Sequence, residues 1–258
     1  MLPADFITEL FLFPFFMVFL RLGTAIMIMP ALSDNAIPVR ARVLFALMAA
    51  FVMFPALQSR IPDVPASTAA MVIMALGEMF IGLLMAIGAR LFLATMSVAG
   101  DVLSFMIGFQ AATLFDPRLG GISTAPALFL TLVGSLLVLA TGLHLVMIEA
   151  IFESYEVLPV GYMPLMGDVA ASITQLITNI YVIGLKIAAP VITVGFLTYM
   201  AFGLLNRLVP QVQAFFVALP LTIMVGLFVL GVSLTTMLTL FSDELFNNAI
   251  ILNQTQSP

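Results

Sequence analysis

Residues Gly108 to Thr124 read Gly-Phe-Gln-Ala-Ala-Thr-Leu-Phe-Asp-Pro-Arg-Leu-Gly-Gly-Ile-Ser-Thr, and they interrupt a chain that is otherwise close to continuously apolar. Gly120-Gly121 and Asp116-Pro117 disfavour a regular helix, because glycine loosens the backbone and proline disfavours the α conformation of the residue before it. The stretch is therefore predicted to be a loop, although three of its side chains favour burial, namely Phe109, Leu114 and Phe115. It is either a connector on the membrane surface or a segment folded into a protein cavity, where non-helical backbone is tolerated at membrane depth.

The composition is that of a polytopic membrane protein. Of 258 residues, 63% are hydrophobic and only 8% are charged, whereas about 25% are charged in a soluble globular domain. The net charge of -5 comes from 13 acidic and 8 basic residues, so no basic surface is expected to attract nucleic acid. The chain has no cysteine and a single histidine, His144, which argues against disulfides and against zinc or heme sites.

Six apolar stretches meet or approach the roughly 20 residues that a helix needs to cross about 30 Å of hydrocarbon. They are residues 6–30, 43–57, 69–99, 125–152, 173–202 and 212–241. The third and fifth are long enough to tilt, bend or fold back as hairpins, so their number does not fix the number of crossings. Prolines inside or at the ends of the stretches favour bent helices: Pro14, Pro55, Pro190 and Pro220. The predicted fold class is all-α, a polytopic helical membrane protein with bent, hairpin-like helices.

Basic residues predict the orientation, because Lys and Arg are enriched in cytoplasmic loops. Alternate connections carry Arg40 with Arg42, Arg118, and Arg207, and the opposite side has Arg60 and an acidic loop. The first set is therefore predicted to face the cytoplasm. If all six stretches cross, both termini face outward.

Charged residues inside the apolar stretches are candidate functional residues, because an ionisable group at membrane depth costs a few kcal/mol or more unless it is paired or hydrated. They are Arg21, Glu78, Arg90, Asp101, Glu149 and Lys186. If residues 69–99 continue as one helix to Asp101, Arg90 and Asp101 share a face but lie about 16 Å apart along the axis, too far to pair. Each then needs a partner in another helix or another subunit, while charges near the ends of stretches can instead reach the headgroups.

Small residues predict where helices approach closely. Thr222, Gly226 and Ser233 fall on one face of the last stretch and are predicted to form a helix contact. Gly77, Gly82 and Gly88 do not line up on one face. We interpret them as local backbone permissiveness and not as a dimer motif.

The sequence predicts neither catalysis nor a cofactor. It has no HExxH, no Gly-x-Ser-x-Gly and no phosphate-binding glycine loop with lysine, which are the motifs that carry such chemistry. Broken helices with buried charges are, however, typical of transporter sites. A small-molecule or ion transporter that works alone therefore stays open as an alternative function.

Short motifs occur along roughly residues 10 to 245 in an order that resembles one membrane-protein family. The most specific is Gly203-Leu204-Leu205-Asn206-Arg207-Leu208-Val209-Pro210-Gln211, followed by Phe215 and Pro220. The others are Arg21 with Pro30, Ser33, Pro38, Arg40 and Arg42; Phe115-Asp116-Pro117; Gly142-Leu143-His144; and Leu158-Pro159-Val160-Gly161. On these residues the chain resembles the FliR family of flagellar export-gate proteins, which includes injectisome counterparts, and it looks more flagellar than injectisome-like. It departs from the pattern at Val212-Gln213-Ala214, where a Leu-Asn-like pair is expected after Pro210-Gln211.

The resemblance implies a subunit of the flagellar type III protein-export gate, in the bacterial inner membrane at the flagellar basal body. A single copy would join FliP and FliQ in a hetero-oligomeric pore and contact the cytoplasmic export platform, unfolded flagellar substrates and membrane lipid. Residues 1–172 would form a FliP-like portion and residues 173–258 a FliQ-like portion.

The resemblance also implies roles for individual residues. The central loop would project into the pore and help to plug it, through Gly108, Phe109, Leu114, Phe115, Asp116, Pro117, Gly120 and Gly121. Its glycines would permit refolding and its apolar side chains would exclude water. Asn206, Arg207 and Gln211 would form a polar turn on the cytoplasmic side. The buried or intersubunit charges would be Arg21, Glu78, Arg90, Asp101 and Lys186.

Overall fold

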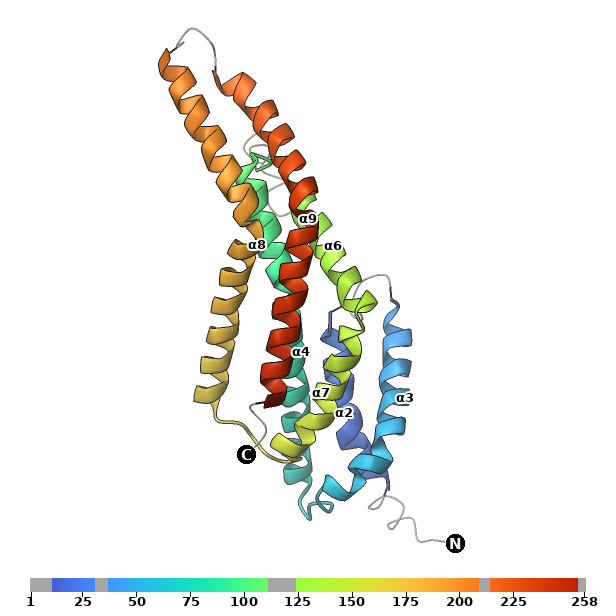
Figure 1. Cartoon of the computed structure of the whole chain (residues 1–258). Coiled ribbons are helices and arrows are strands. Elements are labelled where there is room, and N and C mark those ends of the chain that lie inside the picture. The colour runs from blue at the N-terminus through green and yellow to red at the C-terminus, as the bar shows by residue number, and fades with distance from the viewer. Residues whose placement is uncertain (1–10, 31–36, 111–123, 209–213, 255–258) are drawn as a thin grey trace. The chain divides into compact units, whose positions relative to one another are not determined.

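A computed structural model describes residues 11–30, 37–110, 124–208 and 214–254 of the chain (Figure 1). In these residues all regular structure is helical and there is no strand, which confirms the predicted all-α fold. The elements are α2 (Phe13–Ile28), α3 (Val39–Leu57), the 3-10 helix η2 (Gln58–Arg60), α4 (Thr68–Met106), α6 (Ala125–Ala140), α7 (Leu143–Val157), α8 (Met166–Leu208) and α9 (Ala214–Gln254).

Four helical segments are long and apolar enough to cross a membrane: Val39–Arg60, Thr68–Met106, Met166–Leu208 and Ala218–Glu244. Helices α6 and α7 are together long and apolar enough for one span. They are bent by 68° at the break between them, as in a broken span or a re-entrant loop. Helix α2, with 16 residues, is shorter than the roughly 20 needed to span. The described part of the chain thus has four or five potential spans, as expected for a polytopic membrane protein.

The break between α6 and α7 lies at a glycine and not at a proline. Gly142 precedes α7 with a φ of +74°, a left-handed conformation that costs glycine little. Pro190 and Pro220, by contrast, lie inside α8 and α9, and Pro14 occupies the first turn of α2, where its missing N–H is not needed. Bent helices are confirmed, but this bend has a different cause from the one predicted.

The chain forms two compact units, residues 1–91 with 138–176 and residues 92–137 with 177–258. The first unit has an apolar core drawn from α2, α3, α4 and α7, in which Met17, Leu22, Ile26, Ala50 and Ile151 are almost fully buried. Neither unit coincides with the predicted portions 1–172 and 173–258, and that division stays a prediction.

Glycines bring the helices of the second unit into close contact. A Cβ atom on Gly100 of α4 would overlap Ala127 of α6, and one on Gly226 of α9 would overlap Ile107. Helix α9 therefore closely approaches Ile107, the residue after α4, at Gly226, which belongs to the small-residue stripe predicted from the sequence.

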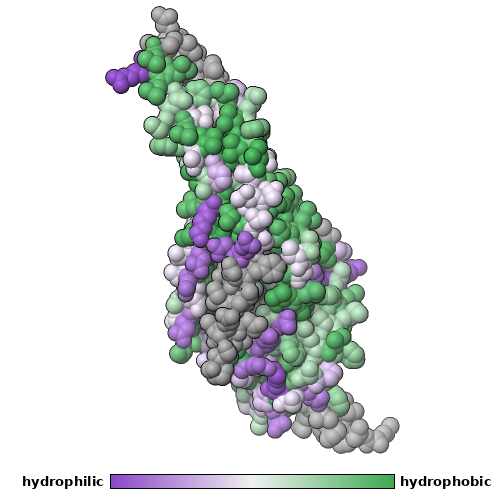
Figure 2. Space-filling model, in the orientation of Figure 1, coloured by the Kyte–Doolittle hydropathy of each residue, from purple (hydrophilic) through white to green (hydrophobic). Residues whose placement is uncertain are grey.

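Much of the visible surface is apolar (Figure 2). On α3, Met48, Phe51 and Val52 are between 68% and 76% exposed. Contiguous exposed apolar surface marks contact with lipid or with another protein. The exposed face of α3 is therefore suited to such a contact and not to water.

Candidate functional site

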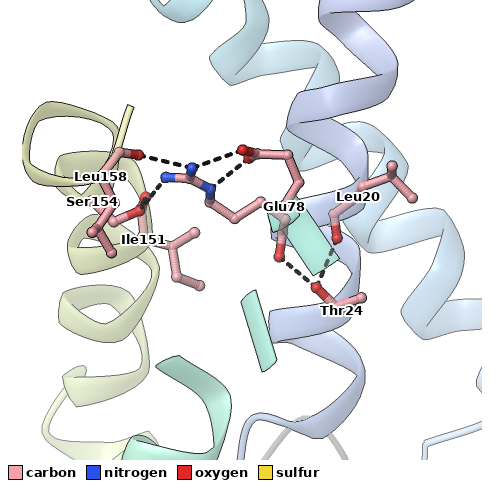
Figure 3. A network of polar contacts seen from close by, with 7 residues as sticks. Leu20, Thr24, Glu78, Ile151, Ser154 and Leu158 are labelled. Carbon is pink, nitrogen blue, oxygen red and sulfur yellow. Dashed lines mark hydrogen bonds and ion pairs between the residues drawn. The ribbon is translucent and has the colours of Figure 1, made fainter. Parts of the chain in front are cut away.

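A buried ion pair joins α2 to α4 in the first unit (Figure 3). The Arg21 and Glu78 side chains are both 0% exposed. Arg21 Nε donates to Glu78 Oε2 at 2.7 Å, and Nη2 donates to Oε1 at 3.0 Å. This bidentate geometry is the strong form of the Arg–carboxylate interaction.

Helix α7 supplies the remaining contacts of the Arg21 guanidinium. Nη1 donates to Ser154 Oγ at 3.1 Å, and Nη2 also donates to the carbonyl oxygen of Leu158 at 2.9 Å. Leu158 caps the C-terminal end of α7, where helix carbonyls lack partners within the helix. The Tyr155 ring covers one face of the guanidinium, with its centroid 3.9 Å from Cζ. Three helices are thus held by one side chain.

Gly82, one turn after Glu78, sets the spacing between α2 and α4. A Cβ atom there would overlap the carbonyl oxygen of Arg21 and the hydroxyl of Thr24. The Thr24 hydroxyl donates to the carbonyl of Leu20 at 2.7 Å. The sequence interpretation of Gly82 as mere permissiveness was therefore wrong, since Gly82 is a helix contact. The usable signal was its i, i+4 spacing from Glu78, which puts both on one face.

This network is a structural cross-link and not an open binding site. The four hydrogen bonds use four of the five N–H groups of Arg21, and neither charge is exposed for a substrate. Among the described residues there is also no group of three His, Asp or Glu side chains that could hold a metal.

The central loop begins at a well-formed helix end in the second unit. Gly108 has a φ of +81°, its N–H donates to the carbonyl of Phe105 at 3.2 Å, and the N–H of Phe109 donates to the carbonyl of Ser104 at 2.9 Å. These two bonds around a left-handed glycine form a Schellman motif. The conformation of Gly108 thus ends α4 and directs the chain into the loop.

Ser104 holds both ends of the loop. Its carbonyl accepts the bond from Phe109, and its buried hydroxyl donates to the carbonyl of Gly100 at 2.6 Å. The same hydroxyl is hydrogen-bonded to Thr124 Oγ1, directly before α6. Because the Ser104 hydrogen is used by Gly100, Thr124 is the donor in this bond. The role of Ser104 could not be predicted from the sequence, since a serine inside a helix gives no signal of its own.

The other charges singled out in the sequence lie at the surface of the chain. Lys186 Nζ of α8 lies 3.0 Å from Glu244 Oε1 of α9. Arg90 and Asp101 are exposed on α4, and within the described ranges neither forms an ion pair. Glu149 is exposed on α7.

Two of the predicted sites, the polar turn and the central loop, lie partly outside the described residues. Asn206 and Arg207 are exposed near the end of α8, but their predicted companion Gln211 is not described. Of the loop, Gly108 and Phe109 are described, and six predicted plug residues are not: Leu114, Phe115, Asp116, Pro117, Gly120 and Gly121.

Comparison with known proteins gives the family. Residues 12–248 match the family described as "Bacterial export proteins, family 1". The chain belongs to this family. The match covers almost the whole chain and confirms the resemblance seen in the motifs. As a member of this export family, the chain is an export component and not an enzyme.

Individual relatives of this export protein carry a flagellar name. The flagellar biosynthetic protein FliR of Caulobacter vibrioides is 35% identical over 228 residues, which are 88% of this chain and 91% of that protein. The FliR proteins of Escherichia coli and Bacillus subtilis are each 28% identical to it, over 93% and 87% of this chain and 89% and 87% of their own.

Proposed function

We propose that this chain is a membrane subunit of a flagellar protein-export gate, present as a single copy with FliP and FliQ in the bacterial inner membrane. The similarity to FliR of Caulobacter vibrioides over 88% of the chain carries the proposal. The four or five potential spans support the membrane location. The FliP-like portion 1–172 and the FliQ-like portion 173–258 belong to the same proposal.

The segment from Gly108 to Thr124 acts in this proposal as the plug of the pore. Phe109 and Thr124, near its two ends, are hydrogen-bonded to Ser104, and the residues between them are the proposed plug. They include Leu114 and Phe115 and the glycine pair at 120–121, a composition that can exclude water and still refold when a polypeptide passes.

Contacts with other subunits would complete the surface of the chain. The exposed apolar side chains of α3 and the exposed charges Arg90 and Asp101 suit neighbouring membrane subunits. Asn206 and Arg207 suit FliQ or the cytoplasmic export platform, and unfolded flagellar proteins would be the substrates. Nothing in the sequence binds nucleotide, so the energy for export would come from other components.

Affinity purification of the chain from its host in mild detergent, followed by mass spectrometry, tests the assignment. Recovery of FliP and FliQ in one discrete particle is expected. The competing function, a transporter that works alone, predicts a stable particle of this chain only and loss of transport on changing Glu78, Arg90 or Asp101. Such a result would replace the gate with the transporter.

A leak measurement separates a plug from a scaffold. Changing Phe109, Leu114 and Phe115 to serine should make the assembled complex permeable to ions and protons, read from the membrane potential and internal pH of proteoliposomes. The matched control changes three exposed residues of another connection to serine: Tyr162, Met163 and Leu165. If both triple variants stay equally tight, the chain is a scaffold without a gating loop.

A further inference from the structure

An apolar groove in the first unit has no role in the function proposed above. It has a volume of about 570 Å³ and runs between α2, α3 and α4, within the range of about 300–1,000 Å³ typical of small-molecule pockets. Its lining includes Phe19, Met27, Val43, Leu76, Phe80 and Leu83. The one hydroxyl in the lining, on Thr24, already donates to a carbonyl of its own helix. The groove therefore suits a hydrocarbon ligand.

The length of the groove matches one leaflet of a bilayer. Along α2 its lining extends from Phe19 to Ile28, which is about 14 Å at a rise of about 1.5 Å per residue. Half of the roughly 30 Å hydrocarbon core is about 15 Å. An acyl chain from one leaflet would fill this length.

A basic side chain lies at one end of the same pair of helices. A second cavity, of about 230 Å³, is lined by Arg42 together with Ile26, Ile37, Ala41 and Phe45. In the chain, Ile26 and Arg42 precede Met27 and Val43 of the groove lining, so this cavity lies at the same end of α2 and α3 as that part of the groove, although the two cavities share no lining residue. Arg42 Nε donates to the carbonyl of Ile37 at 3.1 Å, a bond that orients the guanidinium and uses one of its five N–H groups.

We propose that this groove binds an anionic phospholipid, with one acyl chain between α2, α3 and α4 and its phosphate at Arg42. Arginine matches phosphate geometry with its planar fork. The predicted cytoplasmic location of Arg42 puts it where anionic lipids are attracted by basic residues. Residues 31–42 contain two basic residues, Arg40 and Arg42, and one acidic residue, Asp34. The net charge of this stretch is therefore positive. The inference depends on membrane insertion and not on the export role.

Fluorescence quenching by brominated lipids tests the groove in the full-length chain. The chain has no tryptophan, so Phe80→Trp adds a single reporter to the lining. In nanodiscs, brominated phosphatidylglycerol should quench this reporter more strongly than brominated phosphatidylcholine. A reporter from Phe228→Trp, on α9 and 72% exposed, should be quenched equally by both lipids.

Matched variants separate a site from general charge attraction. In the Phe80→Trp background, Arg42→Ala should weaken binding of phosphatidylglycerol about fivefold, and Arg42→Lys, which keeps the charge but loses the planar fork, should weaken it less. Arg40→Ala makes the same charge change at an exposed position outside the lining and should leave the lipid preference intact. Gly23→Leu, which fills the groove, should reduce quenching by both lipids, whereas Gly231→Leu on α9 should not.

Three results would overturn the proposal. Equal quenching of the Phe80→Trp reporter by the two lipids would show contact without a headgroup site. Equal effects of Arg40→Ala and Arg42→Ala on phosphatidylglycerol binding would show that general surface charge, and not a site at Arg42, attracts the lipid. No quenching by either lipid would mean that protein, and not lipid, covers the groove.

Discussion

Arg21 can be buried because every side of its guanidinium has a suitable neighbour. Glu78 supplies the countercharge, Ser154 and the Leu158 carbonyl supply further acceptors, and the Tyr155 ring covers one face. Such a pair is not in itself strong evidence of stability, because desolvation of both ions opposes their attraction. Its loss is costly for a different reason, since removal of one partner leaves the other charge alone in the interior.

Breaking this pair should destabilise the chain far more than breaking an exposed one. Glu78→Gln is expected to lower the unfolding free energy by about 3–5 kcal/mol. The double variant Arg21→Met/Glu78→Leu should lose less unfolding free energy than Arg21→Met or Glu78→Leu alone. Arg60→Met removes the exposed pair with Glu156, whose side chain is 61% exposed, and should cost about 1 kcal/mol or less. Thermal unfolding in mild detergent measures all of these variants, and similar losses for Glu78→Gln and Arg60→Met would contradict the assignment.

Ser104 should matter for the loop and little for the rest of the chain. Ser104→Ala removes the bond to Thr124, so the loop ends should separate more often. The chain has no cysteine, and Phe109→Cys therefore gives a unique site whose maleimide reactivity should rise several-fold in the Ser104→Ala background. Ser135→Ala is the control, because that hydroxyl bonds only to Thr131 within α6 among its described contacts. An unchanged reactivity would show that Ser104 does not hold the loop.

Among the elements, the pair α2 and α4 shows how far helix contact depends on a single missing side chain. Gly82→Ala would place a methyl group against the backbone carbonyl of Arg21. Because backbone atoms cannot change rotamer as a side chain can, the substitution should lower the unfolding free energy by about 1–3 kcal/mol. Gly231→Ala, on α9 with nothing within 4 Å of the added carbon, should raise it by about 0.5–1 kcal/mol. Thermal unfolding checks the opposite signs, and a stabilising Gly82→Ala would rule out the close contact.

The helices could be predicted from the sequence, but their contacts could not. The apolar stretches 69–99 and 173–202 became α4 and α8, which extend to Thr68–Met106 and Met166–Leu208, since polar residues beyond an apolar stretch can still continue a helix. Arg21 and Glu78 were each singled out, yet their pairing depends on how α2 meets α4, which no local pattern records. The same holds for Gly82 and Ser104, because the groups that explain them belong to distant segments.

For the whole molecule, the proposed assembly explains two features that a lone chain leaves without a role. Large apolar side chains are exposed on α3, and Arg90 and Asp101 are exposed on a helix apolar enough to span a membrane. An ionisable group at that depth needs a partner or water. Contacts with FliP and FliQ would cover the apolar side chains of α3 and would supply groups that pair with Arg90 and Asp101.

Asp101→Asn should therefore separate assembly from folding. The side chain is exposed and forms no ion pair in the described part of the chain, so the stability of the chain alone should change by about 0.5 kcal/mol or less. The yield of the complex with FliP and FliQ should nevertheless fall several-fold, because in the proposed assembly a basic partner side chain would lose its countercharge. Asp168→Asn, at an exposed residue in the first turn of α8, makes the same chemical change and should leave the yield intact. Co-purification and thermal unfolding of both variants measure the two effects, and a loss of stability in Asp101→Asn without a loss of complex would place the role of Asp101 within the chain.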